Sequence, residues 1–168
     1  MSEINPGTLY LVPTPIGNLE DITERAVEVL KQADIIAAED TRHTRILLDH
    51  LGIAGRVVSY HEHNKKEAGP KLIEKLLEGQ SVAQVSDAGM PVISDPGADL
   101  VRLALAENLP IVPLPGPNAA LIALLIITVA YQADWQHHVW NTLMVYIMGI
   151  LCDDQWYRSE RKSDQLRL

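Results

Sequence analysis

Acidic, basic and histidine side chains gather in two short segments of the sequence. Residues 37–44 read AAEDTRHT and place Glu39 and Asp40 beside Arg42. Two adjacent acids next to an arginine suit proton transfer or substrate orientation, and they equally suit a capped helix whose acid pairs with an arginine. Residues 61–64 read HEHN. Because no third histidine follows at a familiar ligand spacing, His61 and His63 predict a polar, substrate-facing edge in preference to a metal site.

Three other segments combine glycine and proline with small polar residues. They are PTPIGN (residues 13–18), SDAGMPVISDPG (residues 86–97) and PLPGPNAAL (residues 113–121). None contains the Gly-Lys-Ser/Thr of a triphosphate-binding loop or the G-x-G-x-x-G of a dinucleotide-binding loop. Ala88 and Gly89 would let a ligand touch the main chain, and Asp87 can accept hydrogen bonds from hydroxyls or amines. The segments therefore indicate a ligand site that uses acidic side chains and no lysine.

Several of these residues also have simpler structural interpretations. Gly17 suits a backbone that turns sharply, as in any strand-to-helix connection. Gly116 and Asn118 suit either an ordinary turn or a helix N-terminus that holds a carboxylate or a ribose oxygen. Asp95 is expected to act only as a helix N-cap, and His43 is expected on the surface of a helix.

Short β-rich runs alternate with helical segments five times along the chain. The expected strands are residues 8–12, 34–38, 56–60, 81–85 and 110–114. The first expected helix is capped by Asp21 and carries an apolar stripe from Ile22 to Ala33. Such alternation with short links predicts an α/β fold with a parallel sheet flanked by helices on both faces. The polar segments all follow strands, so they should meet at the carboxyl ends of the sheet, where ligands bind.

Composition restricts the class of protein. The 168 residues are 47% hydrophobic, enough for a core, and the net charge of −8 argues against a general nucleic-acid coat. Cys152 is the single cysteine, which excludes an intrachain disulfide and suits a reducing, cytoplasmic location. The first ten residues lack a secretory pattern. Four lysines after HEHN would form either a phosphate-binding stretch or a solvated helix face: Lys65, Lys66, Lys71 and Lys75.

Five segments, in this order and at these intervals, closely resemble the ribosomal RNA small subunit methyltransferase I family of the tetrapyrrole methylase-like superfamily. They are LYLVPTPIGNLEDIT, AAEDTRHTRILL, HEHN, QVSDAGMPVISDPG and VPLPGPNAA, and the resemblance covers residues 8 to about 124. The resemblance implies the N-terminal domain of the tetrapyrrole methylase fold. It also implies transfer of a methyl group from S-adenosylmethionine (SAM) to the ribose 2′-hydroxyl of a cytidine in 16S rRNA, with the small ribosomal subunit as partner.

The resemblance further implies which residues form the site. Three loops would hold the cofactor through Pro15, Gly17, Asn18, Ser86, Asp87, Ala88, Gly89, Met90, Pro115, Gly116, Asn118 and Ala119. The RNA side would carry Glu39, Asp40, Arg42, His61 and His63. The acceptor of the ribose proton would be Glu39, Asp40 or one of these two histidines.

The last part of the chain departs from the family pattern. Residues 1–118 are expected to form a SAM-binding half-domain, and residues 119–168 an aberrant or truncated tail in place of a second α/β domain. A membrane helix is disfavoured, because the uncharged run at residues 119–131 falls short of the ~20 residues needed to span a bilayer. The tail would be an interaction module anchored on Trp135, Trp140 and Tyr146, or the product of a frame shift near Leu124, which we favour.

The expected function is therefore a SAM-dependent rRNA methyltransferase impaired by loss of the second domain. Two alternatives are a methyltransferase that acts on a tetrapyrrole and an inactive α/β fragment. A homodimer in which a second copy completes the cleft is also compatible with the sequence.

Overall fold

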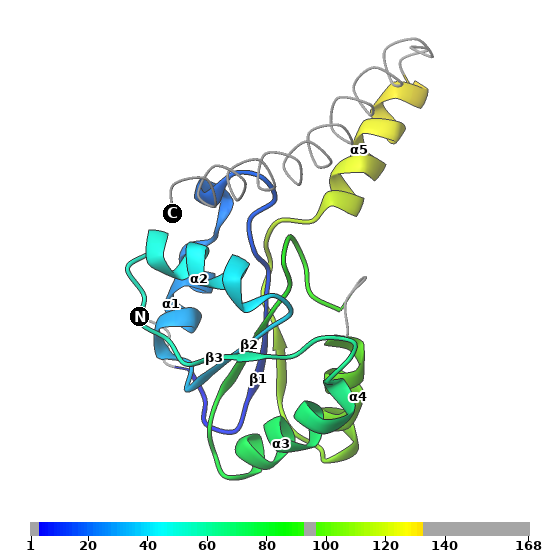
Figure 1. Ribbon diagram of the computed structural model, residues 1–168. Coiled ribbons are helices and arrows are strands. Elements are labelled where there is room, and N and C mark those ends of the chain that lie inside the picture. Colours follow the sequence, from blue (N-terminus) through cyan, green and yellow to red (C-terminus); the bar gives the residue numbers. More distant parts are fainter. Residues whose placement is uncertain (1–3, 93–96, 133–168) are drawn as a thin grey trace. The chain divides into compact units, whose positions relative to one another are not determined.

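The computed structural model describes residues 4–92 and 97–132, which form strands and helices in alternation (Figure 1). The strands are β1 (Leu9–Val12), β2 (Ile35–Ala38), β3 (Val57–Ser59), β4 (Val82–Val85) and β5 (Ile111–Pro113). The helices are η1 (Leu19–Asp21, a 3-10 turn), α1 (Glu24–Gln32), α2 (Thr41–His50), α3 (Lys65–Leu77), α4 (Gly97–Ala106) and α5 (Ala119–Gln132). The chain divides into two units, one ending at Pro117 and one beginning at Asn118.

The five strands form one parallel sheet in the order β3-β2-β4-β1-β5. Strand β4 lies between β2 and β1, with Ala83 in register with Ile36 on one side and Tyr10 on the other. All four residues of β1, β2 and β4 are buried, as expected for parallel strands covered on both faces. The predicted α/β fold with a parallel sheet is confirmed.

Alternate strand residues point into two separate cores. Tyr10, Ile36 and Ala83 pack with residues of α1 and α2, including Val29 and Leu48. On the opposite face Leu9, Ile35 and Val82 pack with residues of α3 and α4, including Leu72 and Leu100. Helices α1 and α2 therefore cover one face of the sheet, and α3 and α4 cover the other.

This arrangement sends neighbouring loops in opposite directions at the centre of the sheet. The connections after β1 and β2 lead to α1 and α2 on one face, whereas the connection after β4 leads to α4 on the other. In open parallel sheets, ligands bind at the carboxyl ends of strands where the loops diverge in this way. The loop after β4 meets this condition twice, because the loops after both of its neighbouring strands, β2 and β1, lead to the opposite face.

One local expectation differs from the structure. Helix α1 begins at Glu24 and is capped by Thr23, whose Oγ1 accepts a hydrogen bond from Ala26 N at 3.2 Å. The prediction that Asp21 caps this helix is wrong, because Asp21 belongs to the separate turn η1. His61 and His63 lie in the turn between β3 and α3, directly after a strand.

The expectations about Asp95, Cys152 and the aromatic anchors Trp135, Trp140 and Tyr146 fall outside the described residues. Within the described ranges, no helix has the length and apolarity required to cross a membrane.

Candidate active site at the carboxyl edge

The loops after β1 and β4 are fastened to each other by main-chain hydrogen bonds. Thr14 N donates to Gly89 O and Gly89 N donates to Thr14 O, both at 3.0 Å. Thr14 Oγ1 donates to Ser86 O at 3.0 Å, and Ser86 Oγ donates to Gly89 O at 3.2 Å. The polar main-chain atoms of Gly89 are thus engaged within the protein, and this glycine holds the two loops together.

Glycine is required at two points where these loops approach one another. Gly89 has a φ of +81°, and a Cβ there would lie 3.1 Å from Ile16 Cδ1. A Cβ on Gly116 would lie 2.7 Å from Pro13 Cβ, so the loop after β5 packs directly on the loop after β1. The three loops therefore form one continuous rim along β4, β1 and β5.

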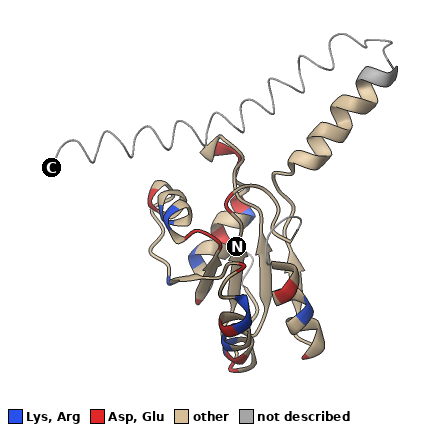
Figure 2. Cartoon of the chain, turned by 45° about the vertical axis from the view of Figure 1, so that its right-hand side comes forward, with Lys and Arg blue, Asp and Glu red and all other residues tan. Residues whose placement is uncertain are grey.

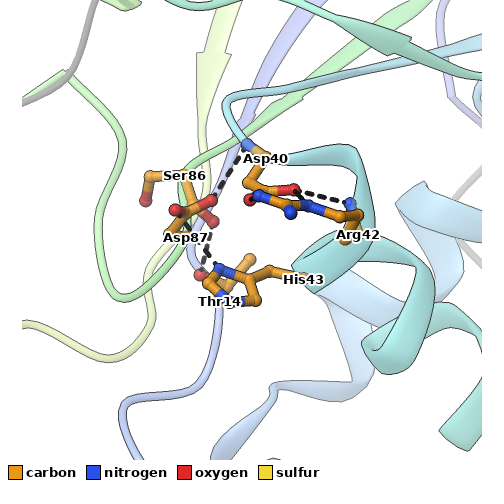
Figure 3. Close-up of polar contacts among 6 residues, drawn as sticks. All are labelled: Thr14, Asp40, Arg42, His43, Ser86 and Asp87. Carbon is orange, nitrogen blue, oxygen red and sulfur yellow. Dashed lines mark hydrogen bonds and ion pairs between the residues drawn. The ribbon is translucent and has the colours of Figure 1, made fainter. Parts of the chain in front are cut away.

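Asp87 connects this rim to the start of α2 (Figure 3). Its Oδ1 accepts a hydrogen bond from Asp40 N at 3.0 Å. Its Oδ2 lies 3.3 Å from Nδ1 of His43, with the Asp87 side chain 39% exposed and that of His43 34% exposed. A carboxylate at the end of β4 is thereby fixed between a backbone amide and an imidazole that both follow β2.

Asp40 is committed to a different partner. Its Oδ1 accepts hydrogen bonds from Arg42 N at 2.8 Å, which caps α2, and from Arg42 Nε at 3.0 Å. The hydrogen bond from the Arg42 side chain lowers the pKa of Asp40 to about 2. Asp40 is therefore ionised and a weak proton acceptor near neutral pH, which argues against it as the base among the predicted candidates.

At the end of β3, the two predicted histidines contact each other. The ring centroids of His61 and His63 are 5.9 Å apart in an edge-on arrangement. His61 N donates to Asn64 Oδ1 at 2.8 Å, and Asn64 Nδ2 donates to Ser59 O at 2.9 Å, so the turn is held locally. Among the described residues, no group of three or more histidine, cysteine or acidic side chains is placed to hold a metal ion.

Two predicted cofactor residues act as local caps. Asn18 accepts a hydrogen bond from Glu20 N at 3.2 Å and so begins η1. Asn118 accepts one from Leu121 N at 3.1 Å at the start of α5, in the second unit. Gly17 has a φ of +78°, which favours glycine. Of the remaining predicted residues, Pro15 is buried, Met90, Gly116 and Ala119 are half-buried, and Ala88 and Pro115 are exposed.

The lysines after HEHN are largely neutralised by nearby acids. Lys65 pairs with both Glu62 and Asp99, and its pKa is raised by the hydrogen bond to Asp99. Lys71 pairs with Glu67, and Lys75 pairs with Glu78. Figure 2 shows acidic and basic residues interspersed along the helices. A solvated, ion-paired helix face fits these contacts better than a phosphate-binding stretch.

Sequence reasoning missed Thr14 and His43 as members of the site. His43 is the third residue of α2, three residues after its N-cap Asp40, and this position turns its side chain toward the carboxyl edge. Only the adjacency of β2 and β4 brings it to Asp87. The sequence signal was its place in the first turn of a helix that follows a strand end.

The described residues of the candidate site lie in a part of the chain that matches a known protein family. Residues 8–140 match the model of the family described as Tetrapyrrole (Corrin/Porphyrin) Methylases. The match continues past Leu124, where the sequence motifs end.

Two curated relatives are similar over about seven-tenths of the chain. Ribosomal RNA small subunit methyltransferase I of Halalkalibacterium halodurans is 61% identical over 119 residues, covering 71% of this chain and 41% of that protein. The protein of the same name from Escherichia coli O157:H7 is 58% identical over 118 residues, covering 70% of this chain and 41% of that protein. The chain spans about two-fifths of the length of these relatives.

Solved structures share the fold. Uroporphyrin-III-C-methyltransferase from Thermus thermophilus aligns with a TM-score of 0.57 at 26% identity, covering 70% of this chain and 51% of that one. A cobalt precorrin-4 methyltransferase aligns with a TM-score of 0.57 at 20% identity, covering 76% and 51%. The latter likeness concerns the fold alone.

Proposed function

Because this chain belongs to the tetrapyrrole (corrin/porphyrin) methylase family, we propose that its carboxyl edge binds SAM and serves methyl transfer to ribosomal RNA. The single observation that carries the substrate class is the 57–61% identity to proteins named ribosomal RNA small subunit methyltransferase I. By the same resemblance, the acceptor is the ribose 2′-hydroxyl of a cytidine in 16S rRNA. A protein with this substrate would work in the cytoplasm, where ribosomes are assembled.

The residues at the edge fit a positively charged sulfonium donor. Asp87 places a carboxylate that is 39% exposed at the β4 end of the rim, and each of its oxygens keeps a lone pair beyond the contacts described above. Ala88 is exposed beside it, so a ligand can touch its main chain. SAM carries no phosphate, which agrees with a rim that has acidic side chains and lacks a phosphate-binding motif.

When bound, SAM supplies an activated methyl group with a good leaving group. The protein then has to align the acceptor oxygen with the methyl carbon and sulfur, and alignment alone can contribute about 7–11 kcal/mol to such a step. The bonds between Thr14 and Gly89 and the close contact of Gly116 with Pro13 hold the rim rigid for this purpose. Arg42 is 73% exposed in its pair with Asp40, a position that suits contact with an RNA phosphate.

A tetrapyrrole acceptor is the second candidate. The solved uroporphyrin-III-C-methyltransferase supports it through the shared fold, but at 26% identity against 61% for the rRNA-modifying relative. We further propose that the parts of the relatives beyond the matched segment contribute to their donor sites. Turnover by the 168-residue chain is therefore expected to be slow unless a second copy completes the cleft.

The test is methyl transfer from tritiated SAM to small ribosomal subunits, with a uroporphyrinoid as the competing acceptor. We expect label in 16S rRNA, at a ribose that resists alkaline cleavage of the neighbouring phosphodiester. Label on the porphyrinoid alone would assign the second candidate. Absence of label on both acceptors, from a folded chain at high concentration, would leave the inactive α/β fragment.

A further inference from the structure

Arginines occupy equivalent positions at the starts of α1 and α2. Thr23 caps α1 and Asp40 caps α2, and the second helical residue of each helix is an arginine, Arg25 and Arg42. Both helices pack on the same face of the sheet and begin at its carboxyl edge (Figure 1). Arg45 follows Arg42 by three residues, so the two side chains are neighbours on the surface of α2. Three exposed arginines therefore lie near the carboxyl edge on the face covered by α1 and α2.

These guanidinium groups have hydrogen-bond donors that the protein does not use. Among the described residues, Arg25 and Arg45 form no ion pair and no side-chain hydrogen bond. Arg42 is joined to Asp40 through Nε and Nη2, which leaves the two N–H groups of Nη1 without a partner in the described part of the chain. All three side chains can therefore donate to a ligand that approaches from solvent.

The position of Arg25 is unfavourable for α1 itself. A cation in the first turn of a helix lies beside the positive end of the helix dipole, which destabilises the helix. The nearby acids do not pair with it: Glu24 in the same turn forms no ion pair in the described structure, and Glu28, one turn on, is paired with Lys31. A negatively charged partner from outside the chain would compensate this repulsion.

The basic residues on the opposite face of the sheet are mostly neutralised. On α3 and α4, ion pairs with nearby acids engage Lys65, Lys71, Lys75 and Arg102, and Lys66 is the exception among the described residues of these helices. A guanidinium also binds a phosphate through two parallel hydrogen bonds, whereas an ammonium acts as a point charge. The face covered by α1 and α2 is therefore the better match to a phosphate backbone.

We propose that Arg25, Arg42 and Arg45 form the surface that binds the RNA backbone beside the methylated nucleotide. The choice of RNA as the partner rests on the proposed function, and the chemical group recognised is the phosphodiester. The nucleotide to be methylated enters at the rim, and the phosphates that flank it lie along the starts of α1 and α2. Contacts of this kind position the strand without reading its sequence.

The first measurement is filter binding of radiolabelled 16S rRNA to the full chain at several KCl concentrations. The double variant Arg25→Gln, Arg45→Gln should bind about tenfold more weakly than the parent. The slope of log affinity against log salt should fall by about 0.7 for each arginine removed. Arg42 is left intact because it also holds Asp40.

A charge-matched variant controls for net charge. Lys71→Gln with Lys75→Gln removes the same two positive charges from the opposite face and should bind 16S rRNA within about twofold of the parent. Equal losses of affinity in the arginine and lysine variants would overturn the proposal, because net charge alone would explain them. Equal affinity in the parent and the arginine variant would overturn it as well.

The second measurement separates RNA binding from a structural role. Because Arg25 opposes the helix dipole and has no partner among the described residues, Arg25→Gln should unfold at the temperature of the parent or slightly above it. Thermal unfolding followed by circular dichroism measures this. A variant that loses stability together with RNA affinity would overturn the proposal, since the arginine would then serve the fold.

The outcomes distinguish this surface from the proposed function. Methyl transfer to rRNA by the parent, with RNA affinity and KM for rRNA unchanged in the arginine variant, would overturn the surface and leave the function standing. RNA affinity that depends on the two arginines, in a chain that methylates only the porphyrinoid, would leave the surface standing and overturn the proposed acceptor. A folded parent that does not bind 16S rRNA would overturn the surface whichever acceptor it methylates.

Discussion

Two aspartates at opposite ends of the same pair of strands are used in different ways. Asp34, just before β2, accepts hydrogen bonds from Ser81 N at 2.8 Å and Ser81 Oγ at 2.7 Å, just before β4. Asp87, just after β4, accepts one from Asp40 N, just after β2, and directs its other oxygen at His43. Each carboxylate thus bridges β2 and β4, one at the amino edge and one at the carboxyl edge.

The partners decide what each carboxylate can do. Ser81 is 1% exposed, and it also receives the Asp34 N–H on Oγ at 3.1 Å, so the amino-edge bridge is a closed exchange of hydrogen bonds. The backbone N–H of Ser81 is the main cause of the lowered pKa of Asp34. At the carboxyl edge, the second partner is an imidazole that can exchange protons. The amino-edge bridge therefore serves stability, whereas the carboxyl edge is where we propose that methyl transfer takes place.

Replacing Asp34 should have a large effect on stability. Asp34→Ala removes the acceptor for two donors of the buried Ser81, and we expect a loss of about 2 kcal/mol in the free energy of unfolding. Urea denaturation measures this loss. Asp49→Ala, an exposed aspartate on α2, is the control and should change stability by less than about 0.5 kcal/mol. Equal stability of the two variants would contradict a structural role for the amino-edge bridge.

Gly89 and Gly79 allow the backbone conformations of the carboxyl edge and the amino edge to be compared. Gly89 at the carboxyl edge and Gly79 at the amino edge both have positive φ, +81° and +88°. A Cβ at Gly89 would meet Ile16 at 3.1 Å, whereas a Cβ at Gly79 would meet nothing within 4 Å. We expect Gly89→Ala to cost about 2 kcal/mol and Gly79→Ala about 1 kcal/mol, because only the first adds crowding to strain. Thermal unfolding of both variants checks this difference, and a larger loss at Gly79 would refute it.

The pair of Asp40 and Arg42 should produce a small acid dependence of stability. The pKa of Asp40 is lowered from 3.8 to about 2, so its contribution is present above about pH 4 and is lost as the pH falls toward 2. Because Arg42 is 73% exposed, solvent screening limits this contribution to about 1 kcal/mol. Unfolding of Asp40→Asn should show a flatter pH dependence than the parent over that window. The lowered pKa of Asp34 contributes equally to the pH dependence of the parent and of Asp40→Asn. If the free energy of unfolding falls equally steeply with pH in both proteins, the effect of Asp40 is disproved.

The fold could be predicted from the sequence because its signals are local. Apolar runs such as those of β2 and β4 are short, continuous and separated by capped helices, which leaves a parallel sheet as the consistent arrangement. The position of the site followed from the same pattern, since the polar segments come after the strands. Helix starts were less certain, because both Asp21 and Thr23 are good capping residues and only tertiary packing selects one.

The contacts within the site could not be predicted, because they depend on strand order. The residues around positions 40–43 and 87 do not indicate that β4 lies next to β2 in the sheet. Without that pairing, His43 would be interpreted as an ordinary surface residue of a helix. Asn18 and Asn118 illustrate a second ambiguity. Their side chains are engaged by helix starts within three residues, an interpretation that residue type alone could not separate from ligand binding.

The central claim, that the carboxyl edge binds a sulfonium methyl donor through Asp87, is tested most directly by calorimetric titration of SAM. The protein is titrated as the parent, as Asp87→Asn and as Asp34→Asn. We predict micromolar binding to the parent, at least tenfold weaker binding to Asp87→Asn, and unchanged affinity in Asp34→Asn despite its lower stability. Absence of binding to the folded parent, or equal affinity in the parent and Asp87→Asn, would contradict the claim.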